Sequence, residues 1–116
     1  IDLFVDVAPV PLTDLVEAEP AEASALVRAR VIEARRRIEA RHTTHTPSPI
    51  TASPLADIEA TPAARDYLTR AAGTLRLSAR AYTRTFRVAR TIADLAGAER
   101  VEREHAAEAL QFRAPD

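Results

Sequence analysis

The chain has 116 residues, a net charge of −1, 47% hydrophobic residues and 28% charged residues, which suits one globular domain. It contains no cysteine, so disulfides, thiolate nucleophiles and cysteine zinc sites are excluded, and no apolar run is long enough to span a membrane. All 16 basic residues are arginine and only two glycines occur, which excludes a Gly-Lys-Ser/Thr phosphate loop and a glycine-rich dinucleotide fingerprint. No secretory signal is visible, so we expect a cytoplasmic location.

The first seven residues alternate in the pattern of a β-strand, and Pro9 and Pro11 follow them. A single strand has no partner for its backbone groups, and no later segment alternates convincingly. We therefore expect residues 1–9 to hold the last strand of a core that lies upstream, together with its connector. Residues 10–116 are expected to form a helical domain. The apolar positions of the strand are Ile1, Leu3, Val5 and Val7.

Two helices are expected in the first third of the chain. A short helix over residues 12–18 has Thr13 as its cap, and a long one runs from a Ser24 cap to about Arg41. Arginines cover much of the long helix, but Glu33 and Glu39 lie close enough in sequence to pair with them, which favours a solvated face over a nucleic-acid contact. The apolar stripe of the long helix consists of Val27, Val31, Ala34 and Ile38.

Residues 42–60 are expected to form an irregular loop, because prolines, serines and threonines are concentrated there. His42 and His45 are three residues apart near its start, but no third ligand accompanies them. His105 lies in a later helix without a nucleophile or a second acid-base group nearby. We interpret all three histidines as structural or surface residues and expect no metal site.

Two further helices are expected to flank a central one. The first has Thr61 as its N-cap, Pro62 in its first position and Gly73 where it weakens or ends. The second runs from about Arg103 to Arg113. The side chains expected in their core are Ala64, Tyr67, Leu68, Ala71, Leu75, Val101, Ala106, Ala109, Leu110 and Phe112.

The most informative segment is the central helix within residues 77–97. Ser78 is its expected N-cap, and Gly97 stands where a left-handed C-terminal cap is typical. At 100° per residue its apolar side chains form one broad face, and three arginines cluster opposite them. The apolar face comprises Ala79, Ala81, Tyr82, Phe86, Val88, Ala89, Ile92, Ala93, Leu95 and Ala96.

Arg80 differs from the other arginines because it follows the Ser78 cap directly. In the first turn of a helix, the backbone N–H groups and the positive end of the dipole favour an anion. A guanidinium there can hold a phosphate through two parallel hydrogen bonds. An ion pair of Arg80 with Asp66, Asp94 or Glu108 is equally compatible with the pattern, so the residues alone leave both alternatives open.

Three sequence blocks closely resemble the C-terminal region of the magnesium-chelatase-like AAA+ ATPases of the ComM/YifB family. They are Leu77-Ser-Ala-Arg-Ala-Tyr, Arg-Val-Ala-Arg-Thr-Ile-Ala-Asp-Leu at 87–95 and His105-Ala-Ala-Glu-Ala-Leu-Gln-Phe-Arg113. Shorter matches occur at residues 30–35 and 1–7. The resemblance implies a mainly α fold, a lid bundle of four to five helices, preceded by one N-terminal β-strand that belongs to the AAA+ core.

The resemblance also implies roles for the arginines of the central helix. Arg80 matches the sensor-2 arginine of the Leu-Ser-x-Arg motif, which directs its guanidinium at the γ-phosphate of ATP. Arg84, Arg87 and Arg90 are expected to contact the core or a neighbouring subunit. The implied cofactors are ATP and Mg²⁺, bound by the full-length parent. This fragment has no P-loop and is not expected to be catalytic alone.

The implied partners are the upstream AAA+ core and further copies in a ring, expected to be a homo-hexamer, with no membrane association. We expect the parent to be a ComM-like DNA branch-migration helicase, which would make DNA a further partner. Two alternatives are the lid of a magnesium chelatase ATPase subunit and a free-standing helical module. That module would bind DNA or protein through the face that carries Arg80, Arg84 and Arg87.

Overall fold

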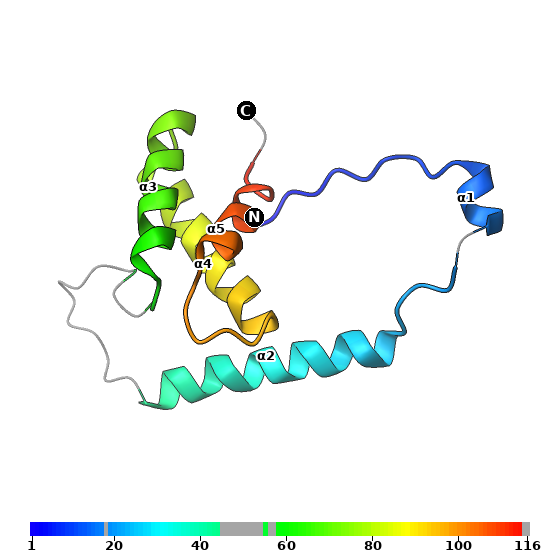
Figure 1. Cartoon of the computed structure of the whole chain (residues 1–116), viewed down its shortest axis with the longest axis horizontal. Helices are drawn as coiled ribbons and strands as arrows, with labels where there is room; N and C mark the ends of the chain where they lie inside the picture. Colours follow the sequence, from blue (N-terminus) through cyan, green and yellow to red (C-terminus); the bar gives the residue numbers. More distant parts are fainter. Residues whose placement is uncertain (18, 45–54, 56–57, 115–116) are drawn as a thin grey trace.

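The computed structural model describes residues 1–17, 19–44, 55 and 58–114, without the side chains of residues 42–44. Within these residues the fold is mainly helical, as predicted, and contains no strand (Figure 1). No described helix has both the length and the apolar character that a bilayer span requires. The helices are α1 (Leu12–Glu17), α2 (Ser24–Thr44), α3 (Pro62–Leu75), α4 (Ala79–Leu95) and α5 (Arg103–Leu110).

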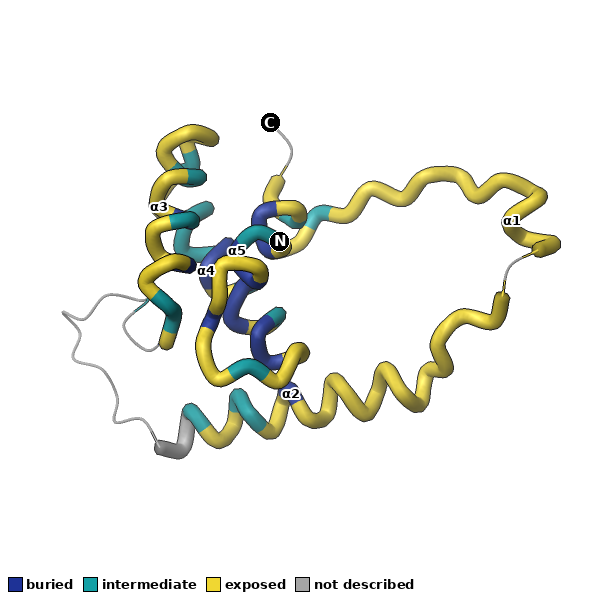
Figure 2. Tube along the Cα trace, in the orientation of Figure 1, coloured by how far each residue is buried: buried dark blue, intermediate teal, exposed yellow. Residues whose placement is uncertain are grey.

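Helices α3, α4 and α5 pack around one apolar core, which the dark segments of Figure 2 mark. Leu68 from α3, Phe86 from α4 and Val101 from the segment before α5 are its largest fully buried side chains. An isolated parallel bridge between Ala60 and Val101 closes the core at one end. The buried members are Ile58, Ala64, Leu68, Phe86, Ala89, Ala93, Val101, Ala106, Ala109 and Leu110.

The predicted core is confirmed at its centre and wrong at several helix ends. Leu75, the last residue of α3, is 37% exposed, and Leu95, the last residue of α4, is 43% exposed. Ala79 and Ala96, at the two ends of α4, are also exposed. Periodicity gives the direction in which a side chain points but not how far the neighbouring helix extends, so the terminal turns remain uncovered.

Both ends of α4 form as predicted. The Ser78 Oγ accepts a hydrogen bond from the backbone N–H of Ala81 at 3.1 Å. Gly97 adopts a φ of 77°, and the next amide, that of Ala98, donates to the carbonyl of Ala93 at 2.9 Å. This is the Schellman arrangement, in which a left-handed residue lets the chain turn back on the last helical carbonyls.

The start of α3 is also as predicted, but its end is not. Thr61 Oγ1 accepts from the amide of Ala64 at 3.2 Å, and Pro62 occupies the first helical position. The helix continues through Gly73, and Arg76 takes the left-handed conformation with a φ of 53°. Gly73 therefore does not end the helix. The left-handed position at the C-terminal end of α3, which usually favours glycine, is occupied by Arg76.

Helix α5 is shorter than predicted, since it ends at Leu110 rather than at Arg113. His105 in its first turn is 6% exposed, and its Nδ1 accepts from the backbone N–H of Glu102 at 3.0 Å. The ring thus satisfies an amide at the helix start that would otherwise lack a partner. The structural interpretation of His105 is confirmed.

Helix α2 lies across one end of the bundle and contacts α4 through its C-terminal half (Figure 1). Ala34 is 4% exposed, whereas residues 24–33 are all exposed. The carbonyl of Ala23 accepts from the amides of Leu26 and Val27, so Ser24 is the first helical residue rather than a side-chain cap. Glu33 pairs with Arg36 at 3.6 Å and with Arg37 at 3.8 Å, as a solvated face predicts.

The loop predicted over residues 42–60 begins later than expected, because α2 extends to Thr44. Residues 45–54 lie outside the described part of the chain. His45 is one of them, so its interpretation as a structural or surface residue stays a prediction. Ile58 is buried, so the end of the predicted loop contributes to the core.

Residues 1–7 form no strand within the described part of the chain, and their role as the last strand of an upstream core stays a prediction. In the described residues, the only hydrogen bond that joins the backbone of residues 1–7 to another backbone group runs from the amide of Phe4 to the carbonyl of Phe112, at 3.0 Å. A strand requires a partner along its length, and no described segment supplies one. Thr13 is not a cap either, because α1 begins at Leu12 and the carbonyl of Pro11 accepts from the amide of Asp14.

Candidate functional site

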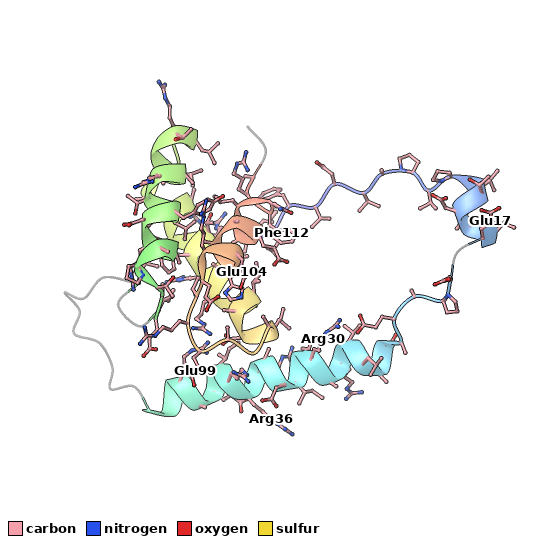
Figure 3. The ribbon with its side chains drawn as sticks, in the orientation of Figure 1. Glu17, Arg30, Arg36, Glu99, Glu104 and Phe112 are labelled. Atoms are coloured by element: carbon pink, nitrogen blue, oxygen red, sulfur yellow. The ribbon has the colours of Figure 1, made fainter. Side chains whose placement is uncertain are left out.

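A groove of about 770 Å³ runs along α4, and its lining includes residues of α4, α5 and the N-terminal segment but none of α3. The N-terminal residues border it at one end, and Figure 3 shows Phe112 where this segment meets the end of α5. We call this feature the α4 groove. Its lining residues are Asp2, Leu3, Ala79, Arg80, Thr83, Arg84, Arg87, Val88, Thr91, Ile92, Leu95, Glu108 and Phe112.

Arg80 lies in the first turn of α4, where the predicted cap places it, and its side chain is exposed. Among the described residues, no carboxylate lies within ion-pair distance of its guanidinium. The candidate partner Asp94 is instead bonded to Arg41 and Arg90. The guanidinium of Arg80 therefore remains available at a helix start, where an anion is favoured.

Arg84 lies one turn further along α4 and is partly buried by the N-terminal segment. Its Nη1 donates to the carbonyl of Ile1 at 2.6 Å, and its Nε lies 3.1 Å from a carboxylate oxygen of Asp2. The pairing fixes the first residues of the chain against α4. It was not predicted, because Asp2 and Arg84 are far apart in the sequence.

Arg87 is the third arginine of the groove, and its side chain is exposed. No ion pair to it is formed within the described residues. Val88, Ile92 and Leu95 follow it along the lining, so the groove changes from cationic at the start of α4 to apolar toward its end. This arrangement suits a ligand that has an anionic part and an apolar part.

Arg90 was predicted to contact a core or a neighbour, but it is only 7% exposed. It bonds Asp94 at 2.9 Å and the carbonyls of Ala98 and Glu99 at 2.9 Å each. The guanidinium thus holds the turn after α4 against the helix. Its side chain is enclosed by its own domain, so the structure corrects the prediction of a surface contact.

An ion-pair network that the sequence did not reveal joins α2 to α4. Arg41 donates through both Nη atoms to the two carboxylate oxygens of Asp94, each at 2.6 Å. The Asp94 side chain is 1% exposed and also pairs with Arg90. The spacing of four residues between Arg90 and Asp94 is a recognisable helix signal. No sequence signal identified Arg41, which is separated from Asp94 by 53 residues.

Histidines and carboxylates do not gather into a candidate metal site within the described residues. His42 lies in the last turn of α2, and its side chain is outside the description. The α4 groove is therefore the candidate site that the described part of the chain presents. Arginines, apolar side chains and the two carboxylates Asp2 and Glu108 line it.

A family model described as magnesium chelatase, subunit ChlI C-terminal, matches residues 21–113. No curated protein and no solved structure gives a significant match to the chain. The matched range includes α2, α3, α4 and α5, and therefore most of the α4 groove. The chain belongs to the magnesium chelatase subunit ChlI C-terminal family.

Proposed function

We propose that this chain is the lid domain of a magnesium-chelatase-like AAA+ ATPase and that Arg80 is its sensor-2 arginine. The observation that carries the proposal is the exposed guanidinium at the capped start of α4, to which no described carboxylate is paired. Arg84, by contrast, is bonded to the N-terminal segment, and Arg90 is buried. Of these three arginines, Arg80 alone combines a helix N-terminus with a side chain that is unpaired among the described residues.

The residues around Arg80 fit the triphosphate of ATP. A planar guanidinium forms bidentate hydrogen bonds with phosphate oxygens, and the first turn of α4 adds a positive electrostatic potential. In this proposal Mg²⁺ accompanies the nucleotide on the upstream core. Arg80 and the first turn of α4 orient the terminal phosphate and stabilise its negative charge. Arg87 contacts the core or a neighbouring subunit.

The test is Arg80→Ala in the full-length parent, with Arg70→Ala as the matched control. Arg70 is an exposed arginine on α3, outside the α4 groove. We expect Arg80→Ala to lower the rate of ATP hydrolysis by about 10²-fold, because it removes a positioned donor to the developing charge. ATP affinity should fall more than ADP affinity, since only ATP carries the γ-phosphate. Unchanged hydrolysis in Arg80→Ala would refute the sensor role.

We further propose that the parent is a cytoplasmic ComM-like motor that forms a hexameric ring and moves branched DNA. The support is the resemblance of residues 77–95 to the ComM branch of the family. Two assays distinguish it from a magnesium chelatase. A ComM-like motor would use ATP to dissociate a four-way DNA junction, whereas a chelatase subunit would support Mg²⁺ insertion into a porphyrin. Porphyrin metalation without junction dissociation would refute the DNA assignment.

A further inference from the structure

Residues 5–17 and 19–23 stand away from the helical bundle in an extended arc that includes α1 (Figure 1). Every one of these residues that is described is exposed (Figure 2). Within the described residues, helix α1 packs against none of the other helices. The arc therefore has the conformational freedom of a tethered segment with few contacts of its own.

The chemistry of this arc is that of an acidic amphipathic segment. Helix α1 carries Leu12, Leu15 and Val16 at the i, i+3, i+4 spacing of one helix face, and they are 78%, 64% and 83% exposed. The first 23 residues contain no arginine, lysine or histidine. Their acidic residues are Asp2, Asp6, Asp14, Glu17, Glu19 and Glu22.

The surface opposite the arc has the complementary character. The part of the α4 groove beyond Arg84 carries Arg87, which no described carboxylate pairs with, followed by Val88, Ile92 and the 43% exposed Leu95. Helix α2 carries an apolar stripe of its own, which extends from the buried Ala34 for two more turns to uncovered side chains. These are Val27 and Val31, which are 40% and 38% exposed.

Both ends of the arc are already attached to this surface. At one end, Asp2 pairs with Arg84 and the amide of Phe4 bonds the carbonyl of Phe112. At the other end, Glu22 forms a bidentate pair with Arg30 at 2.6 and 2.8 Å. Figure 3 shows Arg30 on the side of α2 that faces the arc.

The two connectors are long enough for α1 to reach the groove. Residues 5–11 can extend about 24 Å, and residues 18–23 about 20 Å. The groove between Arg84 and Leu95 is about 16 Å long, and six helical residues occupy about 9 Å. Arg37 lies beside Gly97 at the end of α4, so α2 brings Ser24 to about 20 Å from that point.

We propose that residues 5–23 form a strap that closes on the molecule and places α1 in the α4 groove. Leu12, Leu15 and Val16 then cover the apolar end of the groove and the α2 stripe, and the acidic side chains lie near Arg87. This is the helix-in-groove mode of recognition, with the chain supplying its own helix. A short tether gives α1 a millimolar effective concentration, which favours its own groove over that of a second copy. The inference does not depend on the role proposed for Arg80.

The absence of cysteine makes the closure directly measurable. Thr13→Cys on α1 and Glu104→Cys on α5 place spin labels at two exposed positions outside the groove lining. Double electron–electron resonance on the 116-residue chain should show a main distance population shorter than the open arrangement of Figure 1 gives. Only the long distance of the open arrangement would overturn the proposal. Diluting the labelled chain with unlabelled chain should leave the short population unchanged, and its loss on dilution would also overturn closure within one chain.

Two variants connect the closure to the apolar face of α1. Leu15→Asp should lower the ratio of closed to open chains by about tenfold or more, because burial of a leucine side chain is lost. Val10→Asp is the matched control, since Val10 is 59% exposed and lies before α1. It should leave the ratio nearly unchanged. Equal effects of the two substitutions, with helix content confirmed by circular dichroism, would refute the assigned contact.

Discussion

The bundle of residues 58–114 and the first 32 residues contain similar apolar side chains but bury them very differently. Of the fourteen exposed large apolar side chains among the described residues, all except Leu75 and Leu95 lie in residues 1–32. In the bundle, three helices converge, so each apolar face meets two others. Among the described helices, α2 meets only α4, and α1 meets no other helix. An amphipathic helix therefore becomes buried only where a second surface reaches it.

The largest expected effect of a single substitution in the bundle is at Asp94. Asp94→Ala leaves the guanidinium of Arg90 buried without its carboxylate and removes the bidentate partner of Arg41. We expect the free energy of unfolding to fall by about 3–5 kcal/mol, measured by urea denaturation. Asp66→Ala, at an exposed carboxylate on α3, should change it by no more than about 0.5 kcal/mol. A loss below about 1 kcal/mol at Asp94 would contradict a stabilising network.

A leucine pair tests the contrast between the two regions directly. Leu68 is fully buried in the bundle, whereas Leu26 on α2 is 60% exposed. Leu68→Ala should destabilise the chain by about 2–5 kcal/mol through lost burial and a residual cavity. Leu26→Ala should change stability by no more than about 0.5 kcal/mol. Comparable losses in urea denaturation would mean that the start of α2 is covered in solution.

The smallest expected effect concerns the helix starts. Ser78→Ala removes the hydroxyl that accepts the Ala81 amide, so we expect a loss of about 1 kcal/mol in the free energy of unfolding. Ser24→Ala alters a serine that begins α2 without serving as a side-chain cap. It should change stability by no more than about 0.5 kcal/mol. If the order of the two losses were reversed in thermal denaturation, the assignment of the caps would be wrong.

The sequence predicts the features of this fold that depend on neighbouring residues. The caps at Thr61, Ser78 and Gly97 are confirmed because each acts within one turn of its own helix. The left-handed Arg76 was not predicted, since its residue type disfavours that conformation. Residues 1–7 have the pattern of a strand but form none within the described residues, because a strand requires a partner and the predicted partner is a core that lies upstream.

The candidate site likewise combines features that depend on neighbouring residues with features that depend on distant ones. The position of Arg80 follows from the local Ser78 cap, and its exposure agrees with the predicted arginine face. The burial of Arg90 depends on carbonyls of the following turn and on a carboxylate shared with Arg41. The attachment of Arg84 to Asp2 joins opposite ends of the chain. Such contacts are set by tertiary packing, which periodicity does not encode.

The Arg41–Asp94 pair attaches α2 to α4 near one end of α2, so a tilt of the helix about this pair moves its opposite end furthest. The distance along α2 from Arg41 to Ser24 is about 25 Å, and residues 24–33 are all exposed. A tilt of about 10° around the Arg41 end would displace Ser24 by about 4 Å while the ion pair stays nearly in place. Small adjustments at the end of α4 would thereby be enlarged at the opposite end of α2, where the strap ends.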